Sequence, residues 1–238
     1  MKCSEISLSV IMPFYNEKDN IISAIEHTII KFKYFKKAEL IIVNYCSNDD
    51  INKKFIDLSI RYPNLIILKY NQNKNILNSI KYKILNDYIL FNSVDLILDT
   101  KDICNIIEQT FPFDLLVLER KEYSLNWNSL VSFFNRIILH IFFPLALIDI
   151  ADCNYTFIIK KDILNKVFPI SVSSNFFNVE IILRAKYLKF DVKTIEIKYN
   201  GNKFSRRYFE RLKNIIYYLK DIFVFRIYSL LLILGIKK

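Results

Sequence analysis

Two apolar runs that each end in a polar turn constrain the fold of this chain most. Residues 8–14, Leu-Ser-Val-Ile-Met-Pro-Phe, lead into Tyr-Asn-Glu, and a helical pattern begins near Lys18. The pattern recurs at 39–43, Glu-Leu-Ile-Ile-Val, before the polar segment 44–50. Continuous runs of Ile, Leu and Val are typical of strands buried on both faces of a parallel sheet. Because open α/β sheets bind ligands beyond the carboxyl ends of their strands, we expect a binding crevice at these turns.

Strand-like and helical segments continue to alternate along the chain. Strand-like runs lie at 6–14, 38–44, 64–69, 87–92, 113–119 and 192–198, and helical patterns lie at 18–34, 50–61, 73–86, 100–109 and 176–189. This alternation predicts an α/β fold in which helices cover both faces of a mostly parallel sheet. Asn, Asp and Ser make the predicted turns, because their side chains bond to the local backbone.

Residues 124–148 predict a further helix, which Pro144 should kink or end. The apolar run 130–148 within it approaches the length of a bilayer-spanning helix. Arg136 and His140 lie near the middle of that run, where they would make a membrane span costly. We therefore expect this helix to pack on the domain, with contact to lipid as a further option.

Positive charge is concentrated at the C-terminal end of the chain. The formal net charge is +10, and from Lys198 onward ten Lys and Arg stand against Glu210 and Asp221. The tail 206–236 starts with basic residues and ends in the apolar segment 222–236, which is short for a membrane span. This combination is typical of an interfacial helix on anionic lipid. The alternatives are a phosphate-rich ligand, and a helix that docks on its own core or on a second subunit.

The cysteines, histidines and glycines exclude several common kinds of site. The cysteines are Cys3, Cys46, Cys104 and Cys153, and the histidines are His27 and His140. Their spacing excludes a zinc site of the usual kind and gives no reason to expect disulfides, so reduced thiols in the cytosol fit best. Gly201 and Gly235 are the only glycines, so a P-loop or GxGxxG is absent. The apolar start is too short for a signal peptide, and both histidines are predicted to be structural.

Several short motifs follow one another in a definite order. They lie at 9–17 (SVIMPFYNE), 39–47 (ELIIVNYCS), 87–96 (DYILFNSVDL), 152–157 (DCNYTF), 177–185 (FNVEIILRA) and 192–197 (VKTIEI). This order resembles that of family 2 glycosyltransferases of the GT-A fold, and within them the polyprenyl-phosphate glycosyltransferases of the dolichol-phosphate-mannose type. The first motif is the most specific match, to S-V-V-I-P-x-Y-N-E, and the resemblance extends over residues 7–220.

By this resemblance the chain adopts the GT-A fold, a Rossmann-like, mostly parallel sheet flanked by helices, with a C-terminal amphipathic helical extension. Residues 1–204 would form the glycosyltransferase domain, and 205–238 a basic and apolar helix for a membrane surface or for docking. The implied reaction moves a sugar from a nucleotide-sugar donor to a polyprenyl phosphate or a cell-surface glycan precursor. The implied location is cytoplasmic, at the inner face of the cell membrane, with an anionic membrane surface as partner and no nucleic acid.

The resemblance also implies the role of individual residues. Those at the nucleotide sugar are Pro13, Tyr15, Glu17, Asn44 and Ser93. Asp95 and Asp152 take the catalytic positions, and Asp95 holds the Mg²⁺ or Mn²⁺ that bridges the diphosphate. Those at the acceptor or its phosphate are Glu180, Lys198, Lys203, Arg206 and Arg207. The four basic residues remain alternatives, because the family's closing R-x-x-G-x-S-K motif aligns with this segment in two ways.

Two departures from the family pattern affect the expected activity. Asn44 and Ser93 stand where the family has Asp, so a nucleotide contact loses its charge and the metal site loses a carboxylate. A ligand set with less charge holds a divalent cation more weakly. The alternative is therefore a GT-A-fold pseudoenzyme that acts as a binding or scaffold protein.

The chain offers no obvious general base for a sugar hydroxyl. A lipid-phosphate acceptor needs none, because the second pKa of a phosphate monoester is about 6, whereas Asp152 would serve as the base for a hydroxyl acceptor. A nucleic-acid binder is a third alternative. The basic charge lies on an apolar helix rather than among exposed stacking aromatics, which disfavours it.

Overall fold

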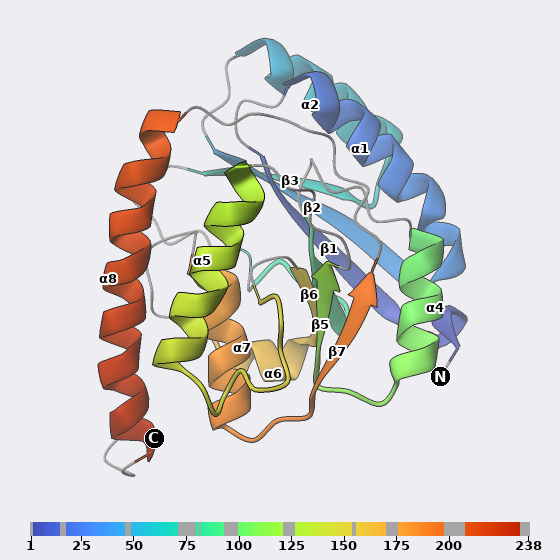
Figure 1. The fold of residues 1–238 in the computed structure, drawn as a ribbon. Coiled ribbons are helices and arrows are strands. Elements are labelled where there is room, and N and C mark those ends of the chain that lie inside the picture. The colour runs from blue at the N-terminus through green and yellow to red at the C-terminus, as the bar shows by residue number, and fades with distance from the viewer. Residues whose placement is uncertain are drawn as a thin grey trace. The chain divides into compact units, whose positions relative to one another are not determined.

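The protein folds into two compact units. The computed structural model describes residues 2–14, 18–45, 49–70, 80, 82–92, 100–120, 127–153, 156–169, 176–197 and 208–233. Unit 1 comprises Met1–Pro112, Ile158–Asp162 and Asn200–Lys203, and unit 2 comprises Phe113–Phe157, Ile163–Tyr199 and Phe204–Lys238. Figure 1 colours the chain along its length, so unit 1 is mostly blue to green and unit 2 mostly green to red.

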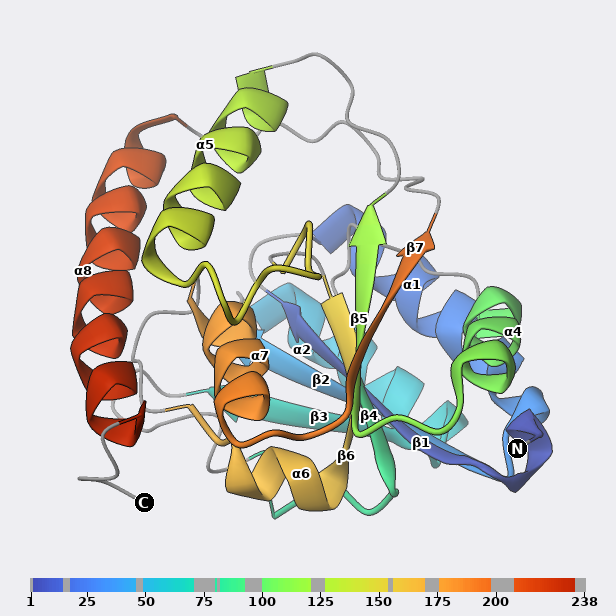
Figure 2. The same ribbon diagram turned by 60° about the horizontal axis from the view of Figure 1, so that its bottom comes forward.

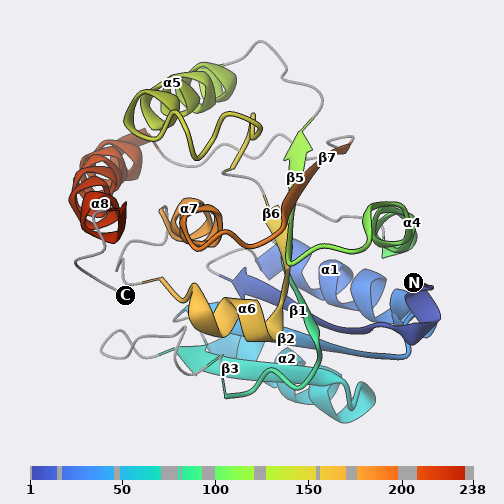
Figure 3. The same cartoon turned by 90° about the horizontal axis from the view of Figure 1, so that it is seen from below.

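A mostly parallel sheet forms the centre of unit 1. Its strands are β1 (Ser7–Phe14), β2 (Lys37–Tyr45), β3 (Leu65–Tyr70), β4 (Tyr88–Phe91) and β6 (Thr156–Lys160, whose first two residues belong to unit 2), in the order β3-β2-β1-β4-β6. β1, β2, β3 and β4 pair with one another in parallel, whereas β6 pairs with β4 in the antiparallel direction. Figure 2 and Figure 3 show β1, β2 and β3 side by side. Leu40, Ile41 and Ile42 are fully buried, as expected for a strand covered on both faces.

Unit 1 contains three α-helices among its described residues. They are α1 (Lys18–Ile30), α2 (Asp49–Arg61) and α4 (Thr100–Thr110), with the short 3₁₀ helices η1 (Cys3–Glu5) and η2 (Lys31–Tyr34). Of these, α1 connects β1 to β2, and α2 connects β2 to β3. Nη1 of Arg61 on α2 lies 3.5 Å from Oε1 of Glu26 on α1, so these two helices are neighbours. The predicted strands of this unit are confirmed, as are the helices predicted at 18–34, 50–61 and 100–109, whereas β6 was not predicted. The helix expected at 73–86 lies mostly outside the described residues, and 82–86 is not helical.

The prediction of reduced cysteines is wrong for one pair. Cys3 of η1 and Cys104 of α4 form a disulfide across Cα atoms 5.4 Å apart. The two cysteines are 101 residues apart in the sequence, so no local pattern predicts that they are in contact. The backbone N–H of Cys3 also donates to Oε1 of Glu108 on α4 at 2.7 Å, so the two elements are joined twice. Cysteine usage therefore no longer supports a reducing compartment.

Unit 2 contains a parallel strand pair and a group of helices. Its elements are β5 (Leu115–Arg120), β7 (Val192–Ile197), α5 (Trp127–Phe142), α6 (Lys161–Lys166, whose first two residues belong to unit 1), α7 (Phe177–Tyr187) and α8 (Tyr208–Ile233). β5 and β7 pair from Leu115 with Val192 to Arg120 with Ile197. α5 ends just before Pro144, as the sequence predicted.

The C-terminal helix α8 packs on its own unit. Tyr218, Ile222, Phe225 and Ser229 are buried and recur at helical spacing, so they form one face. That face contacts α5 and α7, and Figure 1 shows α5 and α8 running side by side. The Phe225 ring lies 5.8 Å from the rings of Phe143 and Phe176. Among the described residues, none of the helices has both the length and the hydropathy to cross a bilayer.

Candidate active site

The carboxyl ends of three neighbouring strands meet at one edge of the unit 1 sheet. Phe14 of β1 is paired with Asn44 of β2, and Ile11 of β1 with Phe91 of β4. The N–H of Asn92, just past β4, donates to the carbonyl oxygen of Ile11 at 2.9 Å. The segments that follow these strands therefore start from adjacent positions, as expected for the ligand edge of an α/β sheet.

Only part of the predicted donor site lies within the described residues. Pro13 is exposed near the end of β1, and Asn44 is 3% exposed at the end of β2. The predicted site residues outside the described part are Tyr15, Glu17, Ser93, Asp95, Lys198, Lys203, Arg206 and Arg207. Their convergence on one pocket stays a prediction. The described residues hold no group of three or more His, Cys, Asp or Glu that would bind a metal.

A buried hydrogen-bond network aligns these strands near their amino ends. The Ser9 hydroxyl donates to Oε1 of Glu39 at 2.5 Å, which joins β1 to β2. The N–H of Leu85 donates to the same Glu39 oxygen at 2.9 Å. The Asn86 side-chain amide donates to the carbonyl oxygen of Leu8 at 3.0 Å, just before β4 starts. Ser9 and Glu39 belong to the recognised motifs, and the structure gives them a positioning role: they set the register of the strands that carry the site.

Asp152 lies in unit 2 beside a buried glutamate that the sequence analysis did not single out. Asp152 is 1% exposed and Glu119, near the end of β5, is 8% exposed. Oε1 of Glu119 accepts N–H bonds from Ala151 at 2.6 Å and from Asp152 at 3.4 Å. These bonds hold the chain at Asp152. Glu119 was missed because it follows an ordinary strand pattern and belongs to no motif.

Burial governs the protonation of this region. Desolvation raises the pKa of the Glu119 carboxyl above its usual range, against the two backbone N–H bonds, and the negative charges of Asp152 and Glu196 raise it further. Glu196 faces Glu119 across the β5–β7 pair. Burial, followed by the charge of Asp152, raises the pKa of the Cys153 thiol to about 12. Cys153 is therefore a protonated, unreactive thiol at neutral pH.

Glu180 takes part in a buried ion pair on α7. Its Oε1 lies 2.9 Å from Nε of Arg184, and the two side chains are 2% and 8% exposed. The Arg184 guanidinium also lies 4.8 Å from the centroid of the Tyr228 ring and 5.7 Å from that of Phe225, both on α8. The carboxylate of Glu180 is thus engaged within the protein, and its predicted role at an acceptor stays a prediction.

The sequence profile of glycosyl transferase family 2 matches residues 9–168, which is more than half of the chain. The chain belongs to this family. A comparison with curated protein sequences gives no match. The family match covers the three strands that meet at the candidate site as well as Glu119 and Asp152.

Solved structures place this family 2 glycosyltransferase in the GT-A fold. Glucosyl-3-phosphoglycerate synthase from Mycobacterium tuberculosis, in complex with Mn²⁺, UDP and phosphoglyceric acid, is 14% identical with a TM-score of 0.64, over 87% of this chain and 74% of that one. A mannosyltransferase from Pyrobaculum calidifontis, in complex with GDP-Man and Mn²⁺, is 15% identical with a TM-score of 0.67, over 94% of this chain and 64% of that one. The predicted α/β, GT-A fold is confirmed. These neighbours bind divalent metal and nucleotide, whereas the closer resemblance to dolichol-phosphate-mannose enzymes remains a prediction.

Proposed function

We propose that this family 2 glycosyltransferase transfers a sugar from a nucleotide-sugar donor to a polyprenyl phosphate. The observation that carries the donor half is the adjacency of the carboxyl ends of β1, β2 and β4 in a chain of this family. Residues 13–17, Asn44 and Ser93 begin or follow these ends and would contact the base, ribose and diphosphate. Asn44 both donates and accepts hydrogen bonds, so it suits a base or ribose.

Asp95 would hold Mg²⁺ or Mn²⁺ at the donor diphosphate. Its carboxylate, with the Ser93 hydroxyl two residues before it, offers the hard oxygen donors that these ions prefer. The bound ion would supply Lewis-acid stabilisation of the departing nucleoside diphosphate. Ser93 brings no charge, so we expect weaker metal affinity than a pair of carboxylates would give.

Two features favour a phosphate acceptor over a hydroxyl acceptor. Asp152 is buried with its backbone held by Glu119, and Glu180 is paired with Arg184, so neither described carboxylate is an exposed base. A phosphate monoester is already mostly ionised at neutral pH, with a second pKa of about 6. Lys198, Lys203, Arg206 and Arg207 supply positive charge in the segment before α8. The proposal includes peripheral association with a membrane, on the cytoplasmic side that the sequence analysis predicted.

Incubation of the full-length protein with UDP-, GDP- and dTDP-sugars, Mn²⁺ and polyprenyl phosphate tests the function. We expect transfer from one donor class, measured as labelled lipid, and Asp95→Asn should lower it by about a hundredfold because metal stabilisation of the leaving group is lost. The matched control is Asp102→Asn, an exposed carboxylate on α4, which should leave transfer unchanged. Folded protein that neither transfers nor hydrolyses any donor contradicts the proposal.

A pseudoenzyme is the second candidate, and Asn44 and Ser93 favour it. Such a protein would bind a nucleoside diphosphate without turnover. Ser93→Asp separates the two: a gain in metal-dependent transfer identifies a weakened enzyme, whereas unchanged inactivity with retained nucleotide binding identifies a binding protein.

A further inference from the structure

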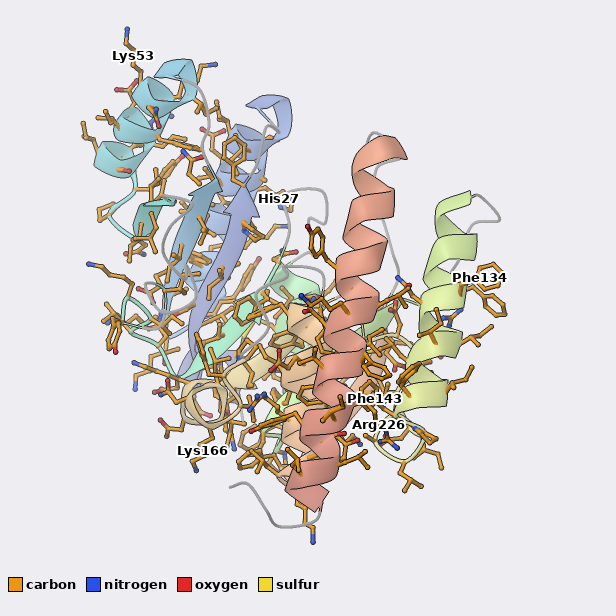
Figure 4. The ribbon with its side chains drawn as sticks, turned by 90° about the vertical axis from the view of Figure 1, so that its left-hand side faces the viewer. His27, Lys53, Phe134, Phe143, Lys166 and Arg226 are labelled. Carbon is orange, nitrogen blue, oxygen red and sulfur yellow. A yellow bond between two sulfur atoms is a disulfide. The ribbon has the colours of Figure 1, made fainter. Side chains whose placement is uncertain are left out.

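An apolar stripe on α5 is left uncovered within unit 2. Phe133, Ile137 and Ile141 recur at four-residue spacing and are 49%, 39% and 70% exposed. Phe134 is exposed beside them and projects from α5 on the side away from α8 (Figure 4). Leu145 and Ile148, in the turn after α5, extend the exposed apolar surface. Contiguous exposed apolar residues of this size mark an interaction surface.

The stripe borders an open hollow that contains a positive charge. The hollow has a volume of ≈ 510 Å³ and is lined by Phe133, Arg136, Ile137, His140, Ile141 and Ala151. The Arg136 guanidinium lies 5.9 Å from the centroid of the Phe133 ring, so charge and apolar wall are adjacent. Nδ1 of His140 donates to the carbonyl oxygen of Arg136 at 2.9 Å, which fixes the orientation of the ring. His140, predicted to be structural, therefore lines this hollow.

The hollow is connected by sequence to the predicted acceptor side. Ala151 immediately precedes Asp152, and Glu119 holds both backbone N–H groups. The charge of Arg136 is near enough to the next residue, Cys153, to act on its thiol. A ligand in the hollow would thus lie against the segment that carries Asp152.

We propose that this hollow binds the phosphate head group of a polyprenyl phosphate while the α5 stripe lies against the bilayer that contains its chain. The inference deepens the proposed function and rests on it. A guanidinium binds phosphate in a bidentate manner and carries five N–H donors, enough for contacts to the protein and the ligand together. Phe133, Ile137 and Ile141 offer an apolar wall for the first isoprene units.

Charge favours a membrane over a second copy of the chain at this surface. α8 lies beside α5 and presents its own exposed apolar residues, among them Leu219, Phe223 and Ile227. By sequence α8 carries Arg211, Lys213, Lys220 and Arg226 against two acidic residues. Because like charges repel, the net positive charge of α8 disfavours a second copy here and is attracted to anionic lipid.

Vesicle co-sedimentation of the full-length protein tests the site without any donor. The vesicles are phosphatidylcholine with polyprenyl monophosphate, with polyprenol as the neutral match. We expect about tenfold tighter binding to the phosphate vesicles, and Arg136→Gln should remove that preference because a charge-assisted pair is lost. Ile141→Glu should weaken binding to both kinds of vesicle. Lys220→Gln, an exposed cation of α8 outside the hollow, is the matched control and should retain the preference.

Several outcomes overturn the site. Equal binding of the wild type to both kinds of vesicle would show that the protein is attracted to the vesicle surface in general. An equal loss of the phosphate preference in Lys220→Gln and Arg136→Gln would show the same. A dimer that Ile141→Glu dissociates would assign the face to a second copy. If Arg136→Gln does not fold, the preference of the wild type for the phosphate vesicles tests the head-group site, and Ile141→Glu, whose side chain is 70% exposed, tests the apolar contact. Deletion of α8 is unsuitable, because it would uncover the buried surface around Phe225.

The two proposals fail separately. Transfer to a water-soluble acceptor without vesicle binding would keep the glycosyltransferase and remove the lipid site. Arg136-dependent vesicle binding without donor turnover would keep the lipid site and remove the enzyme.

Discussion

Removal of the Glu180 carboxylate should destabilise unit 2 severely. In Glu180→Ala the Arg184 guanidinium, 8% exposed, would keep its charge and lose the oxygen that now lies 2.9 Å away. Breaking a buried ion pair by removing one partner costs about 3–5 kcal/mol. Because total stabilities of domains are about 5–15 kcal/mol, this is a third or more of a typical value.

Urea unfolding followed by circular dichroism measures the effect as a shift of the midpoint at constant slope. The double variant Glu180→Met with Arg184→Met should recover most of the loss, because apolar replacement of a whole buried pair is often neutral or stabilising. Asp149→Ala is the matched control, because Oδ2 of Asp149 lies 2.5 Å from Nζ of Lys186 on the same helix α7 but is 53% exposed. It should cost at most about 1 kcal/mol.

The prediction for the buried ion pair is wrong if Glu180→Ala lowers the free energy of unfolding by no more than Asp149→Ala does. It is also refuted if the double methionine variant is as unstable as the single alanine variant. The first result would mean that Arg184 reaches water or another anion, and the second that the pair is needed for packing rather than charge.

Three further predictions concern buried ionisable and sulfur groups. Because the pKa of Glu119 is raised in the folded protein, the contribution of this group to stability is complete below its unfolded pKa and is lost as pH rises through its folded pKa. The Glu119→Gln variant keeps an oxygen that accepts the N–H of Ala151 and carries no titrating carboxyl. Its stability relative to the wild type should therefore increase with rising pH, measured as urea midpoints across pH. Cys153, with its pKa raised to about 12, should resist iodoacetamide at neutral pH in the folded protein and react only in urea, as mass spectrometry of its peptide would show; labelling under native conditions would contradict its burial. Cys104→Ser should lower the stability of oxidised protein by about 2–5 kcal/mol, because the Cys3–Cys104 disulfide closes a long loop; an unchanged midpoint would mean that the thiols are not joined in solution.

The sequence predicted those parts of the fold that depend on local pattern. β1, β2 and β3 are continuous apolar runs, and α5 ends at a proline, so their boundaries follow from neighbouring residues. β6 was missed because Thr-Phe-Ile-Ile-Lys is only five residues long and its first two residues belong to the motif at 152–157. The disulfide and the Glu119 contact join residues far apart in the chain, and neither leaves a local pattern.

The candidate site was predicted to a similar extent. Motif order singled out Asn44, which lies beside Phe14 at the carboxyl ends of β1 and β2 and whose contact with a nucleotide stays a prediction. It did not predict that Glu180 is paired within the core, or that His140 lines a hollow beside Arg136. Such features depend on which helices become neighbours, which a single sequence does not specify.

The Ser9–Glu39–Asn86 network has a consequence for how such a protein changes over evolutionary time. It joins β1 to β2 near their amino ends, whereas Asn44 lies near the carboxyl end of β2. Substitution of Asn44 therefore leaves these hydrogen bonds intact. A sheet held in this way accepts changes at the carboxyl ends of its strands before the strands lose their alignment.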